Sequence, residues 1–195
     1  MRQRLLTAAC LVGFGLSAGR ARATYHTFRI NEVYSNPSGT VQFIEFREVF
    51  GFNSQNFVTQ APDIHSTTHD FVFPVNLPST ATANKDFLLA TIAYEAIAGA
   101  PTPDYVIPAN FFSPLGDTLQ YGTTGPDGTV DLTTFGALPT DPVKSLTRTA
   151  TSGNNYTVAT NSPTNFAGAT GTVPEPASGL LAAGAAGLLL RRRRR

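Results

Sequence analysis

The chain has 195 residues, a formal net charge of +1 and a hydrophobic share of 42%, which suits one domain with a sizeable core and short terminal segments. Its single cysteine, Cys10, excludes an internal disulfide and a set of thiolate metal ligands. No P-loop motif occurs, and we expect neither a cofactor nor a bound metal.

Residues 1–23 have the pattern of a secretory signal peptide. The basic start MRQR is followed by an apolar stretch from Leu5 to Ala18 and by an A-x-A cleavage motif at Ala21 and Ala23. We therefore expect the export machinery and a signal peptidase to act here, and the mature chain to begin near Thr24. A lipoprotein signal around Cys10 is the weaker alternative, because its apolar region would be only a few residues long.

The charge of the exported part differs from that of the whole chain. Between Thr24 and Val173 there are five basic and twelve acidic residues, so its net charge is 5 − 12 = −7. An acidic domain disfavours nucleic acid as a partner and favours solubility.

Residues 24–160 are predicted to form a single all-β domain. Prolines are scattered from Pro37 to Pro163 and exclude long helices almost everywhere, while short β-prone runs alternate with Asn, Gly, Pro and Asp. This pattern is typical of an antiparallel sandwich or barrel.

The first two strands are predicted to form a hairpin, with TFRINEVY (27–34) and TVQFIEF (40–46) joined by the turn residues SNPSG. Strict alternation in the first strand places four residues on one face: Phe28, Ile30, Glu32 and Tyr34. Further strands are expected at 69–77, 86–92, 104–108, 116–122, 129–136, 143–148 and 155–160.

The segment 85–99 is ambiguous. We interpret DFLLATI as a buried strand and YEAIA as one helical turn that ends at Gly99 and Pro101. A single helix through both parts is the alternative. Residues 161–172, NSPTNFAGATGT, are small and polar and are predicted to be a linker.

Residues 173–195 combine two prolines, an uncharged stretch and five arginines. The stretch 177–190 would be about 21 Å long as a helix, against roughly 30 Å for the hydrocarbon core of a bilayer. Long arginine side chains can reach the headgroups and lengthen the span. We predict a single transmembrane helix with a cytoplasmic arginine cluster. A buried core helix or a nucleic-acid patch suits this order of segments less well.

Three sets of side chains could carry chemistry. Glu32, Glu45 and Glu48 lie on or near the predicted hairpin, where two carboxylates could act in glycoside hydrolysis. His65 and His69 have the i, i+4 spacing of zinc ligands on a helix, but no helical pattern surrounds them, so we expect a loop with two exposed histidines.

The third set is PDGTVD, with Asp127 and Asp131, which hints at calcium. It lacks the remaining ligands of an EF-hand loop, and we expect a turn.

The tail resembles the PEP-CTERM sorting signal of Gram-negative bacteria, which has a Pro-Glu-Pro box, a short transmembrane stretch and a basic end. The matching residues of the box and of the arginine cluster are Val173, Pro174, Glu175, Pro176, Arg191, Arg192, Arg193, Arg194 and Arg195. The resemblance covers 173–195 and implies an exosortase as a partner, cleavage near the box, and release or surface attachment. It also implies extracellular polysaccharide as a neighbour.

The body resembles a lamin-tail-type domain in INEVYSNPSGTVQFIEF, in GDTLQYG followed by GPDGTVDLTTFG, and in SLTRTATSGNNYTVATNSPTNFAG. The chain departs from that family in having no Trp, in REVFGFN after FIEF, and in SPTNFAG at the end. The resemblance implies an immunoglobulin-like antiparallel β-sandwich that serves as an accessory module, with glutamates at the positions of Glu32 and Glu45 that have no hydrolase activity.

We therefore expect a non-enzymatic structural or binding protein of the cell surface or exopolysaccharide matrix. It would be exported across the inner membrane, held there by its C-terminal helix, and then processed. Two alternatives stay open: a secreted hydrolase that uses Glu32 and Glu45, and an uncleaved single-span periplasmic binding protein.

Overall fold

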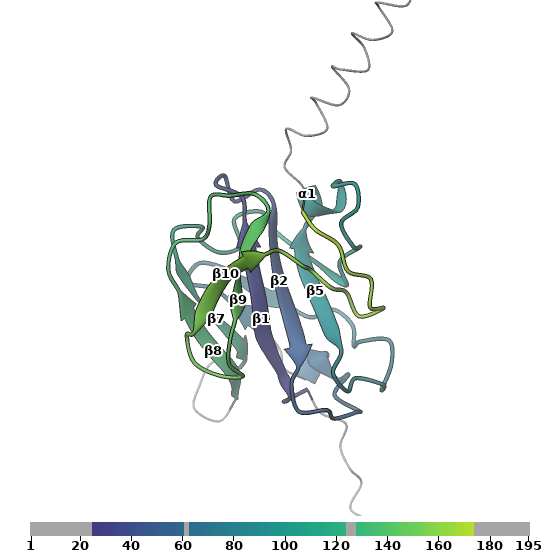
Figure 1. The fold of residues 1–195 in the computed structure, drawn as a ribbon. Helices are drawn as coiled ribbons and strands as arrows, with labels where there is room; N and C mark the ends of the chain where they lie inside the picture. The colour runs from purple at the N-terminus through teal and green to yellow at the C-terminus, as the bar shows by residue number, and fades with distance from the viewer. Residues whose placement is uncertain (1–24, 61–62, 124–127, 174–195) are drawn as a thin grey trace, which may run out of the picture.

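A computed structural model describes residues 25–60, 63–123 and 128–173 (Figure 1). The predicted signal peptide, the box from Pro174 onward, the transmembrane stretch 177–190 and the arginine cluster 191–195 lie outside these residues. Within them, no helix has the length and apolar character needed to cross a bilayer.

The described chain is an all-β sandwich of two sheets, as the sequence predicts. The larger sheet has the strand order β10-β9-β1-β2-β5-β6 and the smaller sheet β4-β3-β7-β8. The strands of the larger sheet are β1 (Phe28–Ser35), β2 (Gln42–Glu48), β5 (Asp86–Thr91), β6 (Tyr105–Ile107), β9 (Lys144–Arg148) and β10 (Tyr156–Thr160). Those of the smaller sheet are β3 (Asp63–His65), β4 (Asp70–Val72), β7 (Asp117–Gly122) and β8 (Thr129–Phe135).

One strand pair corrects the expectation of a purely antiparallel fold. β6 runs parallel to β5, and the crossover between them contains the short helix α1 (Ile92–Glu95). A parallel neighbour needs such a crossover, because a tight turn can join only antiparallel strands. The interpretation of 85–99 as a strand followed by one helical turn is confirmed, and the single-helix alternative is wrong.

The alternation predicted for the first strand is wrong in its second half. The β1–β2 register shifts between Ile30 and Glu32, where a bulge accommodates an extra residue. As a result Val33, not Glu32, follows Ile30 into the core between the sheets. Glu32 and Tyr34 are moved to the outer face of the larger sheet, where Tyr34 joins a second apolar cluster.

The core between the sheets is rich in aromatic side chains. Phe46 of β2 stacks on Phe87 of β5 with ring centroids 4.6 Å apart, and Tyr121 of β7 meets Phe46 edge to face at 5.1 Å. Such offset and T-shaped pairs add to the stabilisation from buried area. The two sheets are therefore joined through a continuous apolar layer.

The segment predicted to be a linker is packed against the domain, which corrects that expectation. We call residues 161–173 the C-terminal strap. In Figure 1 this yellow-green segment leaves β10, crosses in front of β1, β2 and β5, and reaches α1. Asn161, Phe166 and Val173 are buried within it. Small polar residues suit such a strap, because they fit closely over a sheet and bond to it.

Candidate functional site

Glu32 and Glu45 are brought together on the outer face of the larger sheet. They are direct cross-strand partners in β1 and β2, and their exposed fractions are only 1% and 3%. Glu32 accepts hydrogen bonds from Ser145 Oγ at 2.6 Å and from the N–H of Ser162 at 3.0 Å. Glu45 accepts bonds from Asn31 Nδ2 and from the N–H of Thr164, both at 2.7 Å. The strap thus lies directly over the carboxylate pair.

Both carboxyl groups of this pair have raised pKa values. Burial raises the pKa of Glu45 to about 8, with further increases from the charges of Asp86 and Glu32 that outweigh the bonds from Asn31 and Thr164. Burial also raises the pKa of Glu32. Raised carboxyl pKa values are what a general acid needs. Here, however, the strap covers both groups, and a substrate has no access to them.

Tyr94 of α1 lies beside this pair. Its ring is fully buried and packs edge to face on Phe43 of β2 at 5.8 Å. Burial raises its pKa, and the charges of Glu32 and Glu45 add to the shift. Its buried hydroxyl has no hydrogen-bond partner among the described residues. An unsatisfied buried hydroxyl is destabilising, so the strap encloses this polar group at a cost in free energy.

Glu48 is not part of this pair. It ends β2, is buried, and accepts bonds from the N–H groups of Phe50, Gly51, Phe52 and Asn84 at 2.7–3.1 Å. Burial alone would raise its pKa, but hydrogen bonds, among them those from Asn84, Phe50 and Gly51, lower it. A carboxylate enclosed by backbone donors fixes a loop and is not available as a base.

The two histidines do not converge, and the prediction of a loop with two exposed histidines is wrong for His65. His65 ends β3, is half-buried, and its Nδ1 lies 2.6 Å from Asp70 Oδ1 on β4. His69 is exposed in the turn between these strands, with Nδ1 2.8 Å from Thr68 Oγ1. No group of three or more potential metal ligands occurs in the part of the chain that the structure describes.

Asp131 is part of strand β8, within the strand predicted at 129–136; Asp127, in the expected turn, falls outside the described residues. The Asp131 carboxylate forms a buried ion pair with Arg148 of β9 and accepts a bond from the N–H of Ile30 at 2.9 Å. Arg148 also donates to the carbonyl oxygen of Ile30. This cluster ties the smaller sheet to the larger one, and sequence spacing gave no sign of it.

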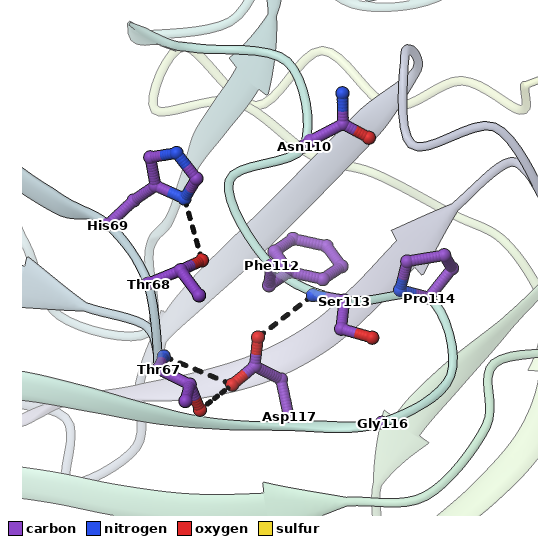
Figure 2. A pocket seen from close by; sticks show the side chains of 9 residues that line it. All are labelled: Thr67, Thr68, His69, Asn110, Phe112, Ser113, Pro114, Gly116 and Asp117. Atoms are coloured by element: carbon purple, nitrogen blue, oxygen red, sulfur yellow. Dashed lines mark hydrogen bonds between the residues drawn. The ribbon is translucent and has the colours of Figure 1, made fainter.

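A surface hollow of about 480 Å³ lies between the β3–β4 turn and the loop before β7 (Figure 2). Asp117 holds its two walls together, because it accepts bonds from the N–H and hydroxyl of Thr67 and from the N–H of Ser113. Although burial opposes it, this bonding lowers the pKa of Asp117. These hydrogen bonds occupy the Asp117 carboxylate, which is therefore not free to act as an acid or base in the hollow.

Only the first residue of the predicted sorting signal lies within the described chain. Val173 is 1% exposed and packs with Tyr34, Phe43 and Tyr94. Its N–H donates to Asn161 Oδ1 at 2.6 Å, and its carbonyl oxygen accepts a bond from Asn161 Nδ2 at 3.4 Å. The strap is thus fixed at both ends through one asparagine.

Comparison of the chain with protein-family models, with curated proteins and with solved structures gave no match.

Proposed function

We propose that this chain is an exported, exosortase-processed protein without enzymatic activity, which acts as a structural or binding module at the cell surface or in an exopolysaccharide matrix. The support for export and processing is in the sequence, namely the signal peptide at 1–23 and the ordered box, apolar stretch and arginine cluster at 173–195. The support for a module comes from the geometry of its buried acids.

One observation carries the non-enzymatic part of the proposal. Each buried carboxylate among the described residues accepts at least one hydrogen bond from a backbone N–H group. These acids and their donors are Glu32 (Ser162), Glu45 (Thr164), Glu48 (Gly51), Asp117 (Ser113) and Asp131 (Ile30). Carboxylates bound in this way hold loops and strands in place, and they stabilise a domain whose only cysteine is in the predicted leader.

The hydrolase alternative is weakened by the same geometry. A retaining or inverting glycosidase needs two carboxyl groups on either side of a bound sugar. Glu32 and Glu45 instead lie side by side beneath the strap, bonded to Ser162 and Thr164. The two-sheet sandwich is compatible with the immunoglobulin-like arrangement that the lamin-tail resemblance implies, and we propose that arrangement for this domain.

The position of Val173 supports a display role. Every strand of the described sandwich precedes Val173, which is bonded to Asn161, and the Pro-Glu-Pro box begins at the next residue. Cleavage near the box would therefore leave the folded domain intact.

Intact-mass measurement on protein from the envelope and medium of the native host tests the proposal. We expect a product that begins near Thr24 and ends near Pro174. A mass that retains Arg195 in the inner membrane would favour the anchored periplasmic alternative. In a separate test, replacing Glu32 and Glu45 by Gln should change stability only; loss of a glycan-cleaving activity in a folded variant would favour the hydrolase.

A further inference from the structure

Two large aromatic side chains are presented to solvent after β2. Phe50 and Phe52 are 50% and 56% exposed, and their rings are stacked with centroids 6.5 Å apart. One exposed apolar residue needs no explanation, but two neighbouring aromatic rings form a patch suited to a ligand.

The loop that carries these rings is held rigidly from below. The buried Glu48 carboxylate binds the N–H groups of Phe50, Gly51 and Phe52, and Gly51 adopts the left-handed φ of 74°. On the far side, the N–H of Ser54 donates to the carbonyl oxygen of Thr80 at 2.7 Å. The loop conformation therefore does not depend on burying the rings, and the fold displays them in a fixed arrangement.

Arg29 of β1 continues this surface. Its guanidinium carbon lies 5.3 Å from the centre of the Phe50 ring. One terminal nitrogen donates to the carbonyl oxygens of His26 and Phe28, while its other guanidinium nitrogens have no acceptor among the described residues. No carboxylate of the described chain forms an ion pair with it.

The environment of Arg29 also favours an incoming anion. Burial lowers the pKa of Arg29; the Asp131 charge opposes this shift, and the Arg148 charge adds to it. The Glu48 carboxylate also acts on Arg29, but Arg148 already binds Asp131, and backbone N–H groups already bind Glu48. A further negative charge here would relieve the repulsion between the arginines.

A small hollow of about 180 Å³ adjoins Arg29. Its lining includes the polar side chains of Asn31, Thr149 and Thr151 and contains no carboxylate. Amide and hydroxyl groups both donate and accept hydrogen bonds, which suits a ligand that is rich in hydroxyl groups. The rings, the guanidinium and the hollow therefore form one continuous surface, which we call the aromatic–arginine surface.

We propose that the aromatic–arginine surface binds an acidic polysaccharide, with one sugar carboxylate on Arg29 and the apolar face of a neighbouring sugar on Phe50 and Phe52. A uronic acid unit combines the three features that the surface selects: a carboxylate, several hydroxyl groups and an apolar ring face. Nucleic acid fits less well, because affinity for a phosphate backbone relies on several basic contacts, and Arg29 is the basic side chain of this surface that has no ion pair among the described residues. The inference rests on the proposed function for its setting in a matrix.

Titration of the full chain, purified in mild detergent, with an oligomer of galacturonic acid tests this proposal, and an uncharged glucose oligomer serves as the second probe. We expect saturable binding of the acidic oligomer that weakens with salt. Arg29→Gln, Arg29→Lys and the double variant Phe50→Ala/Phe52→Ala should each weaken it by about tenfold or more, because a guanidinium fork and stacked rings are not replaceable by these side chains. Leu115→Ala, at a residue that is 84% exposed elsewhere, is the matched control and should bind normally.

Three outcomes would overturn the proposal: no binding at millimolar oligomer, equal binding of the neutral oligomer, or unchanged binding by the variants. A fourth is self-association that the double Phe variant abolishes, because the rings would then contact a second copy. The double variant leaves the bonds of Arg29 to His26 and Phe28 in place, so it tests the surface even if the Arg29 variants unfold. None of these results depends on how the tail is processed, so failure here is distinguishable from failure of the proposed function.

Discussion

Asn161 and Val173 hold the two ends of the C-terminal strap together through reciprocal hydrogen bonds between the side-chain amide of Asn161 and the backbone N–H and C=O of Val173. This single contact closes a loop over the outer face of the larger sheet, with Glu32 and Glu45 beneath it. The strap is therefore a structural part of the domain.

Replacing Asn161 by Ala should loosen the strap. The change removes the acceptor for the Val173 N–H and leaves a buried donor unsatisfied, which typically costs about 1–3 kcal/mol. We expect faster hydrogen exchange in 161–173 and a lower denaturation midpoint. Thr151→Ala, at an exposed residue outside the strap, is the control; equal exchange in both variants would show that Asn161 does not hold the strap.

Stability should fall as pH rises from about 4.5 to about 8. The folded-state pKa of Glu45 is raised to about 8, so the folded protein binds this proton more tightly than the unfolded chain. The stabilisation is therefore complete below the unfolded pKa and is lost as pH rises through the folded one, at up to about 1.4 kcal/mol per pH unit.

Asp86, with its pKa raised by burial to about 6, adds the same trend at lower pH. Urea denaturation between pH 5 and 9 measures this slope. Glu45→Gln keeps the shape of the side chain but removes its titratable group, so the free energy of unfolding should depend less on pH. A wild-type stability that rises over this range would contradict the assignment.

Below about pH 4 the trend reverses, because Glu48 and Asp117 have lowered pKa values and their protonation destabilises the fold.

Breaking the ion pair between Asp131 and Arg148 should strongly destabilise the domain. Both side chains are almost completely buried, so Arg148→Met leaves an uncompensated buried carboxylate, which costs about 3–5 kcal/mol. The double variant Asp131→Leu/Arg148→Met should recover part of this loss. Chemical denaturation measures both. Arg47→Ala, which removes a partly exposed pair with Asp86 at 3.9 Å, should change the stability by less than about 1 kcal/mol. Similar losses for Arg47 and Arg148 would contradict the structure.

Gly39→Ala should destabilise the domain more than Gly153→Ala. Both glycines have a left-handed φ, of 69° and 81°, so both changes carry the same backbone strain. Only at Gly39 would the new Cβ clash with another group, Asn110 Oδ1; at Gly153 the nearest atom, Asn155 Nδ2, would be 3.9 Å away. The difference between the two denaturation midpoints isolates this contact. Equal midpoints would show that Asn110 moves away freely.

The candidate carboxylates show where sequence patterns stop being informative. Placing Glu32 and Glu45 on the two arms of one hairpin was possible from turn chemistry and alternation. The face that Glu32 occupies could not be predicted, because the bulge between Ile30 and Glu32 moves every later side chain of β1 to the opposite face. Asp117 and the Arg148–Asp131 pair gave no local signal, since their contacts join segments that are distant in the sequence.

The sequence by itself determined the all-β class, the position of most strands and the split of 85–99 into strand and helical turn, and it predicts two processing signals at its ends. These depend on local properties: proline spacing, side-chain alternation, turn residues and runs of like character. Only the tertiary structure decided that β6 lies parallel to β5, that 161–173 is a strap and not a linker, and that Phe50, Phe52 and Arg29 share one surface. Those features depend on which surfaces meet in space, and the free energy of such contacts is not encoded in any short stretch of residues.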